Sequence, residues 1–298
     1  MKNEKKLISI ILNCYNGERY LREALTSVQN QTYKNWELIF WDNRSEDKSK
    51  TILESFKNKK FKYFKSSKFT NLYTARNLAV KKTNGEFISF IDSDDIWEND
   101  KLQMQIKYFR DTSVALVYGN LWIKREPSNK KRLFINYKIK QGYIYHDLIN
   151  HYNIGIIATI LRKKYLQKFN KIFNEKYNII GDYDLFLKLA KNYKIRAVQK
   201  PLATYRIHSS NYSILNKNLE AKELENWLKD NRKNLTNKEY KKIKIKILQI
   251  KFVYLKYNHN IYKTFAFFVS YFKFLIGVKN IIILFFPRYL LKKFIWFF

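Results

Sequence analysis

The chain has 298 residues, of which 46% are hydrophobic, so it is long enough and apolar enough to bury a sizeable core. Its 58 Lys and Arg against 25 Asp and Glu give a formal net charge of +33, which predicts an anionic partner: a nucleic acid, an anionic membrane surface or a phosphorylated substrate. The single cysteine, Cys14, excludes an internal disulfide framework and fits a reducing compartment.

The N-terminal region begins with charged residues, which are followed by a short apolar stretch from Leu7 to Leu12. That stretch is too short for a signal peptide and has no small-residue cleavage site after it. We therefore expect the bulk of the chain to stay in the cytoplasm.

From residue 7 to residue 118, short apolar runs alternate with longer amphipathic ones. This order is typical of βαβ units around a parallel sheet. In the first amphipathic segment the apolar residues fall three or four apart, so they share one helical face. The predicted strands cover 7–13, 36–41, 61–64, 86–91 and 114–119, and the predicted helices between them cover 17–31, 47–57, 72–82 and 99–110.

Beyond Tyr118 the pattern is looser. Its segments are a basic strand-like stretch at 121–142, a helix at 143–150, an apolar run at 154–163, a helix at 182–192 and a strand-like stretch at 194–208. This mixed character predicts a second half that completes the sheet and shapes a binding site. The sequence contains no internal repeat.

The last part of the chain is basic and aromatic. Residues 240–298 hold 12 Lys and Arg and no Asp or Glu, and their apolar runs are all shorter than the roughly 20 residues of a transmembrane helix. Basic side chains interleaved with Phe, Trp and Ile predict helices that lie in the interface of an anionic membrane. The alternative is a helical cap that packs on the rest of the protein. We do not expect nucleic acid as the partner, because the chain has no zinc-ligand spacing, RNA-binding strand signature or helix-turn-helix pattern.

Three carboxylates follow the apolar run at 87–91: Asp92, Asp94 and Asp95. The run predicts a strand buried on both faces, so the acids lie at its carboxyl end, where open parallel sheets bind their ligands. Crowded carboxylates repel one another unless a cation or hydrogen-bond donors compensate, and hard oxygen ligands suit Mg²⁺ or Mn²⁺. Helix capping is the alternative role, but Asn99 and Asp100 are better placed for it. The acids therefore predict a metal or nucleotide site.

The glycine content argues against two common nucleotide-binding motifs. The chain has 7 Gly and contains neither G-x-G-x-x-G nor G-x-x-x-x-G-K-[ST]. Dinucleotide oxidoreductases and P-loop NTPases therefore lack their main signals here. Without a glycine-rich loop around the phosphates, a bridging metal is the natural neutraliser.

Four segments, in order, resemble the family 2 glycosyltransferases, which have the GT-A fold. They are "SIILNCYNGERYLREALTSVQNQTYKNWELIFWDNRSEDKS", "TARNLAVKKTNGEFISFIDSDDIWENDKL", "GDYDLFLKLA" and "YRIHSSNYS". The resemblance covers about residues 5–213, and four ordered segments are more specific than any one of them.

The resemblance implies an α/β catalytic domain with a Rossmann-like, mostly parallel central sheet flanked by helices. We expect this domain at 1–213, with a nucleotide-sugar-binding half at 1–118 and an acceptor-binding, catalytic half at 119–213. Residues 214–298 lie outside the resemblance, and we expect them to form a helical, membrane-associating region.

The resemblance also implies roles for individual residues. The donor is a nucleotide-sugar, most often a UDP-sugar, and the residues expected at its nucleotide are Asn13, Tyr15, Asn16, Glu18, Asp42, Asn43 and Arg76. Asp92 and Asp94 match the two acids of the D-x-D motif, which faces the ribose, the diphosphate and a metal ion, Mn²⁺ or Mg²⁺. Asp95 is the neighbouring acid and is assigned to substrate binding. Asp182 matches the catalytic base, and His208 matches a histidine near the diphosphate or the metal.

One position departs from the family pattern, and two have ordinary structural explanations. Members often carry two adjacent acids where this chain has Asp42 and Asn43. Asparagine can still hydrogen-bond a nucleotide, but the change can alter base or donor preference. Asp182 could be an ordinary helix N-cap, and His208 could be a surface histidine in a basic loop.

The predicted function is an inverting, metal-dependent transfer of a hexose to a membrane-linked glycan such as lipooligosaccharide, capsule or a lipid-linked oligosaccharide, at the inner face of the cytoplasmic membrane. A Lewis-acidic metal stabilises the departing diphosphate, and a carboxylate removes the proton of the acceptor hydroxyl. Two other classes fit part of the sequence. A haloacid-dehalogenase-like phosphatase also has D-x-D after an apolar run, although its motif continues with Thr or Val rather than Asp95. A non-catalytic module that binds polyanions or membranes explains the charge but not the clustered acids.

Overall fold

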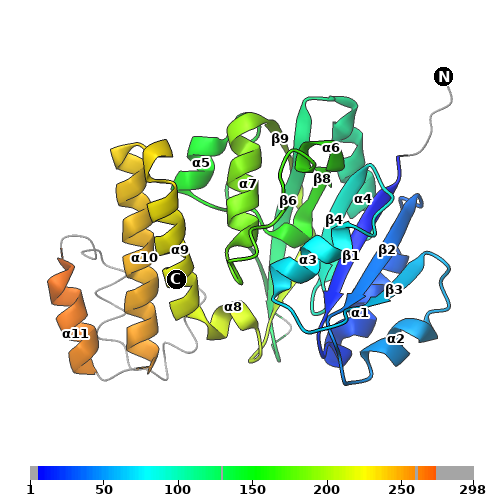
Figure 1. Cartoon of the computed structure of the whole chain (residues 1–298), viewed down its shortest axis with the longest axis horizontal. Coiled ribbons are helices and arrows are strands. Elements are labelled where there is room, and N and C mark those ends of the chain that lie inside the picture. The colour runs from blue at the N-terminus through cyan, green and yellow to red at the C-terminus, as the bar shows by residue number, and fades with distance from the viewer. Residues whose placement is uncertain (1–5, 129, 259–260, 273–298) are drawn as a thin grey trace. The chain divides into compact units, whose positions relative to one another are not determined.

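The computed structural model of the chain describes residues 6–128, 130–258 and 261–272 (Figure 1). The chain divides into two compact units, Met1–Ser209 and Ser210–Phe298.

In the described part of the first unit, nine strands form one sheet. They are β1 (Ile8–Cys14), β2 (Trp36–Asp42), β3 (Phe61–Lys65), β4 (Phe87–Asp92), β5 (Ile96–Trp97), β6 (Val114–Arg125), β7 (Lys131–Leu133), β8 (Thr159–Arg162) and β9 (Lys194–Ile207). Their order in the sheet is β3-β2-β1-β4-β8-β6-β9-β5, with β7 paired to β6. The strands from β3 to β4 are mutually parallel, β8 is antiparallel to both of its neighbours, and β6 is parallel to β9.

Among the described residues of this unit, seven α-helices and two 3-10 turns connect these strands. The helices are α1 (Glu18–Gln29), α2 (Ser49–Ser55), α3 (Leu72–Val80), α4 (Lys101–Ile106), α5 (Tyr145–Asn150), α6 (Lys163–Leu166) and α7 (Gly181–Asn192), and the 3-10 turns are η1 (Lys107–Arg110) and η2 (Ile156–Ala158).

The helices cover both faces of the sheet (Figure 1). On β4, Ser89 Oγ accepts a hydrogen bond from Lys101 of α4 (2.9 Å), whereas the ring of Phe90 lies under the Arg76 guanidinium of α3 (5.7 Å). Successive strand residues point to opposite faces, so α4 and α3 lie on opposite sides of the sheet. This double cover explains why the central strands are continuous apolar runs and why every residue of β2 is buried.

The predicted strands correspond to β1, β2, β3, β4 and the first half of β6, but two details differ. The predicted helix at 99–110 is the short α4 followed by the 3-10 turn η1, and Asp100, which precedes α4, makes no side-chain capping bond. The two-residue strand β5 has no signal of its own, because it is defined by its antiparallel pairing with β9.

A buried carboxylate joins the strands at the end of the sheet where β1, β2 and β4 begin. The two oxygens of Glu37 accept hydrogen bonds from Ser9 Oγ (2.6 Å), Lys62 Nζ (2.6 Å) and the backbone N–H of Asn84 (2.7 Å). Ser9 Oγ in turn accepts from Gly85 N (2.8 Å). Burial raises the pKa of Glu37, but these donors outweigh burial and lower the pKa to about 2. Glu37 therefore ties β1, β2, β3 and the start of β4 together.

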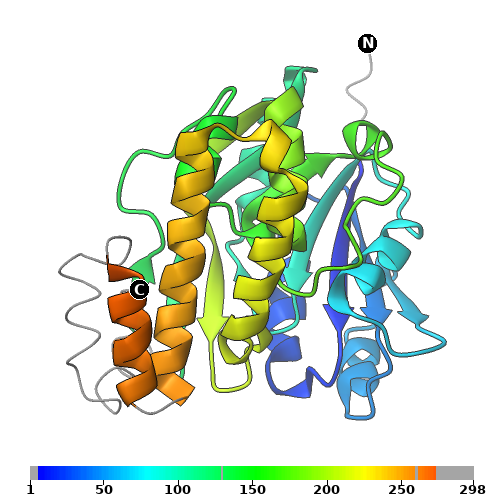
Figure 2. The same cartoon turned by 60° about the vertical axis from the view of Figure 1, so that its left-hand side comes forward.

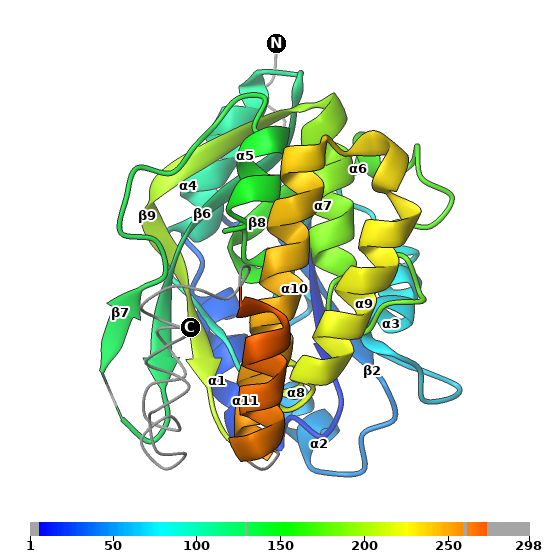
Figure 3. The same cartoon turned by 90° about the vertical axis from the view of Figure 1, so that its left-hand side faces the viewer.

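The second unit is helical. Its elements are α8 (Tyr212–Leu215), α9 (Lys217–Asp230), the 3-10 turn η3 (Arg232–Asn234), α10 (Asn237–Asn258) and α11 (Ile261–Ser270). Thr236 and Glu239 form a capping box at the start of α10, with Glu239 N donating to Thr236 Oγ1 (3.3 Å) and Thr236 N donating to Glu239 Oε2 (2.9 Å). Figures 2 and 3 show α9 and α10 side by side, and an ion pair between Glu225 and Lys251 (2.5 Å) links them.

The interfacial helices predicted for 240–298 are described only in part. Most of α10 and all of α11 fall in this range, and residues 273–298 lie outside the described residues. Within the described ranges, no helix combines the length and the apolar character needed to cross a bilayer.

Replacing Glu37 with Gln should lower the free energy of unfolding by about 2 kcal/mol at pH 7, because hydrogen bonds to a charged group are worth roughly 1.5–3 kcal/mol. The pKa of Glu37 is depressed, so its contribution is present above the unfolded-state pKa and is lost as pH falls toward about 2. Urea unfolding at pH 7 and at pH 3 measures both effects. Glu54→Gln is the matched control: this exposed side chain forms only a 3.6 Å surface pair with Lys50, so the expected change is small. Equal losses in the two variants would contradict the role of Glu37.

Candidate active site

Adjacent parallel strands end at one edge of the sheet and bring three predicted site residues together. Asn13 of β1 lies opposite Asp92 of β4, and Asp42 ends β2 on the other side of β1. Asp42 accepts a hydrogen bond from Tyr63 Oη (2.7 Å). Asn13 Nδ2 is buried and has no hydrogen-bond partner among the described residues, so this amide is available to a ligand at the edge.

Arg76 is the buried cation of this edge. Its side chain is 3% exposed, and Nη2 donates to Asp92 Oδ1 at 2.6 Å. The guanidinium also lies over the rings of Tyr73, Phe90 and Phe173 at 5.4 to 5.9 Å. Burial lowers the pKa of Arg76, but Asp92 and other nearby groups more than offset this and raise it. The guanidinium stays charged and neutralises Asp92.

Asp182 lies in the first turn of α7. The residue before this helix, at its N-cap position, is Ile180, so Asp182 is not the cap that its position after a glycine suggested. Gly181 allows the helix to begin close to α3, because a Cβ at this position would come within 2.7 Å of the Tyr73 ring. The close approach brings the Asp182 carboxylate to the Tyr73 hydroxyl.

The Asp182 carboxylate has two tyrosine hydroxyls around it. Tyr73 Oη lies within hydrogen-bond distance of both Oδ1 (3.1 Å) and the Ile179 carbonyl oxygen (2.8 Å), which share its one hydrogen, and Tyr152 Oη lies 3.5 Å from Oδ2. Burial raises the pKa of Asp182, while the Arg76 charge and the Tyr73 hydrogen bond lower it and only partly compensate. An aspartate with a raised pKa is a better proton acceptor than an exposed one.

Asp94 and His208 form a second pair at the site. Asp94 Oδ2 lies 2.8 Å from His208 Nε2, although the two residues are 114 positions apart in the sequence. The ring of Tyr20 lies 5.0 Å from the His208 ring. The His208 side chain is 9% exposed, so it is not the surface histidine that its basic loop allowed.

Asp95 is buried and positions the acidic segment. Its Oδ1 accepts a hydrogen bond from Arg206 N (2.8 Å), and Oδ2 has no partner among the described residues. Burial and then the neighbouring carboxylates raise the pKa of Asp95 well above its usual range. The Arg206 guanidinium holds the same segment by donating to the Asp94 carbonyl (2.8 Å), Glu23 (2.9 Å) and Glu126 (2.9 Å). The 92–95 segment is therefore fixed against β9.

Three predicted nucleotide-pocket residues, Tyr15 and Asn16 in the loop after β1 and Glu18 at the start of α1, have two different settings. Tyr15 is 53% exposed, and its ring lies 4.7 Å from the exposed ring of Phe69. Asn16 Oδ1 and Glu18 Oε2 each accept from a backbone N–H of the loop at 46–48 (both 2.9 Å). Asn16 and Glu18 thus brace the loops that follow β1 and β2, while Tyr15 faces outward.

The asparagine that departs from the family pattern has a structural role. Asn43 Nδ2 donates to the Thr70 carbonyl (2.7 Å), and Asn43 Oδ1 accepts from Thr70 Oγ1 (3.0 Å). An ionised aspartate can only accept, so it would leave the Thr70 carbonyl without this donor. The substitution is therefore matched to the loop that leads into α3.

The residues at this edge fit a divalent metal in part. The carboxylate of Asp94 and the imidazole of His208 are both ligands that Mn²⁺ accepts. Their 2.8 Å separation is close to the roughly 3.0 Å between adjacent ligands of an octahedral ion with bonds of about 2.1 Å. Arg76 occupies Asp92 Oδ1, which leaves Oδ2 as the atom for a ligand. Across the described residues, no cluster of three or more His, Cys, Asp or Glu could hold a metal alone, so a substrate phosphate or water would have to complete its shell.

Sequence reasoning missed three residues that organise the site. Tyr73 and Tyr152 flank Asp182, and Arg206 ties the acidic segment to β9. Tyr73 lies three positions before Arg76, which is the spacing of one helical face, and Arg206 of β9 lies two positions before His208, which directly follows that strand. Those spacings are the available signals; for Tyr152 the sequence offers none.

Comparisons with known proteins identify the family of the chain. The family described as "Glycosyl transferase family 2" matches residues 9–187, which is more than half of the chain. The chain belongs to glycosyl transferase family 2. A UDP-Glc:alpha-D-GlcNAc-diphosphoundecaprenol beta-1,3-glucosyltransferase, WfgD of Escherichia coli, is 32% identical to this glycosyltransferase over 209 residues, covering 70% of this chain and 79% of WfgD.

Two solved proteins share the fold. TarS of S. aureus, residues 1-349 in complex with UDP-GlcNAc, has a TM-score of 0.60 at 18% identity. The match covers 90% of this chain and 80% of that TarS chain. In the comparison with a longer TarS chain, the match has a TM-score of 0.61 and covers half of the TarS length. The mannosyltransferase PcManGT of Pyrobaculum calidifontis, in complex with GDP-Man and Mn2+, has a TM-score of 0.60 at 14% identity and covers 95% of this chain and 79% of its own.

The family match and the shared fold confirm two predictions. The chain has the GT-A fold, with a mostly parallel sheet flanked by helices, and it is an enzyme of the glycosyltransferase class. The phosphatase and the non-catalytic module are therefore set aside.

Proposed function

We propose that this glycosyltransferase moves a hexose from a UDP-sugar to a hydroxyl group of a membrane-linked glycan, with inversion at the anomeric carbon and with Mn²⁺ or Mg²⁺ as cofactor. The proposal is carried by two features of the site: the Asp94–His208 pair, and a partly buried carboxylate, Asp182, which is influenced by the same Arg76 charge that pairs with Asp92. The Asp94–His208 pair is suited to the diphosphate side of the reaction. The Asp182 carboxylate is suited to the acceptor side.

On the donor side, several groups face the edge where the nucleotide would bind. Asn13 Nδ2 offers an unused donor, and the exposed ring of Tyr15 offers a stacking surface. Asp94 and His208 would hold the metal, which when bound supplies Lewis-acid stabilisation to the departing diphosphate. Arg76 keeps Asp92 neutralised, so the diphosphate meets less repulsion.

On the acceptor side, Asp182 would take the proton of the attacking hydroxyl. The oxygen of that hydroxyl forms a bond to the anomeric carbon while the bond from that carbon to the diphosphate oxygen breaks. The proton passes to the Asp182 carboxylate, which Tyr73 orients by its hydrogen bond. Asp42, Asn43, Asn16, Glu18 and Asp95 would then act by shaping the nucleotide pocket.

The acceptor class and the place of action are part of the proposal. WfgD is named for an acceptor carried on a lipid diphosphate, which supports a lipid-linked glycan here. On α11, Tyr262, Phe265 and Val269 are 78%, 53% and 55% exposed, and their spacing of three and four positions gives the helix one apolar face. With the acid-free composition of 240–298, this face supports attachment to an anionic membrane surface from the cytoplasmic side.

Transfer of radiolabelled hexose from UDP-hexoses to a detergent-solubilised, lipid-linked sugar diphosphate tests the proposed function. EDTA should abolish transfer, and added Mn²⁺ should restore it. Asp94→Ala should lower kcat/KM by at least about 100-fold, the size of effect seen when one group that stabilises charge in a transition state is removed. Asp100→Ala, an exposed acid a few residues away, is the control and should resemble wild type. Full transfer by Asp94→Ala, or in EDTA, would overturn the metal-dependent mechanism.

The pH dependence tests the proton acceptor. The ionised form of Asp182 is the active one, so kcat should fall as pH falls through its raised pKa, at a pH above the usual 3.9 of aspartate. Tyr73→Phe removes a hydrogen bond that favours the ionised form. Its acid limb should therefore move to higher pH by about 0.7 unit, the equivalent of roughly 1 kcal/mol.

Tyr33→Phe is the control for this shift, because Tyr33 Oη donates to the Lys6 carbonyl (2.6 Å) and touches no site residue. Its kcat–pH profile should match that of wild type. An acid limb that stays in place in Tyr73→Phe, or that moves to lower pH, would contradict the role of Asp182.

A further inference from the structure

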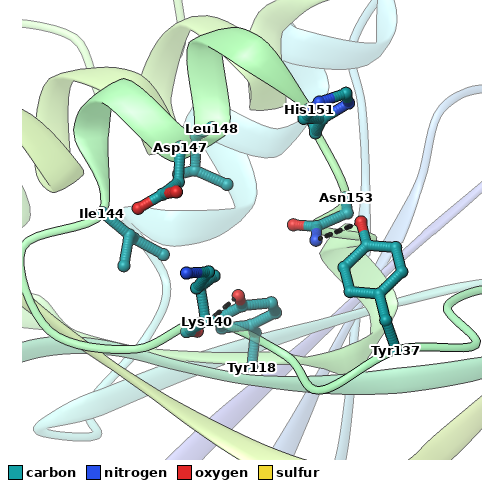
Figure 4. Close-up of a pocket in the computed structure, with 8 residues that line it drawn as sticks. All are labelled: Tyr118, Tyr137, Lys140, Ile144, Asp147, Leu148, His151 and Asn153. Carbon is teal, nitrogen blue, oxygen red and sulfur yellow. Dashed lines mark hydrogen bonds between the residues drawn. The ribbon is translucent and has the colours of Figure 1, made fainter.

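A cavity of about 270 Å³ lies in the first unit between α5 and the segment that follows β7 (Figure 4). Its lining includes the buried side chains of Tyr118, Ile144 and Leu148. None of its lining residues belongs to the predicted nucleotide, metal or catalytic set. It is somewhat smaller than the roughly 300–1,000 Å³ clefts that hold drug-sized ligands, which suits a ligand of one or two small rings.

Three polar side chains point into this cavity from different segments: Lys140, Asp147 and Asn153 (Figure 4). Asn153 is 9% exposed, and its Nδ2 donates to Tyr137 Oη (3.2 Å). Asn153 Oδ1 is buried and has no hydrogen-bond partner in the described part of the chain. A buried carbonyl oxygen without a donor is unfavourable for folding alone, so its presence points to a ligand that donates to it.

The charges of the cavity select the class of ligand. Lys140 and Asp147 form no ion pair with each other or with any other described residue, so one cation and one anion both face the cavity. A phosphate would meet the Asp147 carboxylate, and a metal ion would meet the Lys140 ammonium. A neutral ligand whose hydroxyl groups both donate and accept satisfies the ammonium, the carboxylate and the Asn153 carbonyl together.

An aromatic side chain adds the apolar contact that such a ligand needs. Tyr137 is 55% exposed at the rim of the cavity. The C–H face of a sugar ring packs well on an aromatic ring, while the sugar hydroxyls reach the buried Asn153 and the exposed Lys140 and Asp147. The lining therefore matches a neutral saccharide more closely than a purely apolar ligand.

The cavity is connected to the candidate catalytic base through one residue. Tyr152 stands in the chain between two lining residues, His151 and Asn153. Its ring lies 4.9 Å from the ring of Tyr183, and its hydroxyl lies 3.5 Å from Asp182 Oδ2. A ligand in the cavity thus lies next to the segment that carries a hydroxyl to the proton acceptor.

We propose that this cavity is a distal sugar subsite, which holds a neutral sugar unit of the glycan acceptor away from the hydroxyl that reacts. The inference rests on the proposed function, because it presupposes a saccharide acceptor. It predicts that acceptors with more than one sugar unit are used better than a single sugar, and that this advantage depends on Lys140 and Asn153.

Saccharide binding to the full chain, measured by saturation-transfer NMR and calorimetry without donor, tests the subsite directly. The probes are chitobiose, cellobiose and maltose, and at least one should bind saturably. Lys140→Gln and Asn153→Leu should each weaken binding at least about 10-fold, as expected when one polar contact to a bound ligand is lost. Lys138→Gln, an exposed lysine two positions away, is the control and should bind as wild type does. No saturable binding by any probe, or equal binding in all variants, would overturn the proposal.

The melting temperature of Asn153→Leu gives an independent readout. Leucine has a similar size and removes the unpaired carbonyl. If Asn153 serves to bind a ligand, the substitution should leave the melting temperature unchanged or raise it. A much lower melting temperature would indicate a purely structural Asn153 and would contradict the subsite. Acceptor kinetics distinguish the subsite from the proposed function. If Lys140→Gln transfers sugar with an unchanged acceptor KM, the subsite is contradicted and the proposed function is not. Saccharide binding without transfer from any nucleotide-sugar would sink the proposed function and leave a sugar site.

Discussion

The ion pair between the buried Arg76 and the half-buried Asp92 is the interaction on which the rest of the site depends. A carboxylate at the end of a buried strand, beside two further acids, is unstable as an anion unless a cation lies close to it. Arg76 supplies that cation from inside the protein, 3% exposed and packed on three aromatic rings. The same charge lowers the pKa of Asp182 against the effect of burial. One guanidinium therefore pairs with Asp92 and also acts on the pKa of Asp182, the carboxylates proposed for the donor and the acceptor side.

In this fold, the groups that stabilise the sheet and the groups of the site lie at opposite ends of the same strands. At the end where the parallel strands begin, Glu37 gathers donors from Ser9, Lys62 and Asn84 and fixes the strands to one another. At the other end the same strands present Asn13, Asp42 and Asp92, and here Asn13 Nδ2 has no hydrogen-bond partner among the described residues. Unsatisfied polar atoms are costly within a core but are expected where a ligand completes them.

The sequence predicts the parallel half of the sheet well and the contacts of the site only in part. Buried parallel strands are continuous apolar runs, so β1, β2, β4 and the acids that follow β4 can be recognised from composition alone. The pairing of His208 with Asp94 and of Tyr152 with Asp182 cannot, because such contacts depend on where distant segments meet. Single residues also change role in three dimensions: Asn43 is an anchor for Thr70, and Asp95 is buried against Arg206 N. Residue types and their spacing predict which chemical groups are present. Tertiary packing determines which of these groups contact one another.

The most direct measurement is nucleotide-sugar turnover by Arg76→Met beside Arg162→Met, at a temperature where both variants are folded. Arg162 is equally buried, donates to Glu86 and the Val114 and Phe109 carbonyls, and is remote from the acids, so both variants should lose a similar amount of stability, about 3 kcal/mol or more. Only Arg76→Met should also lose transfer activity, by at least about 100-fold, because Asp92 and Asp182 are then left without their cation. Wild-type kcat/KM in folded Arg76→Met would contradict the account.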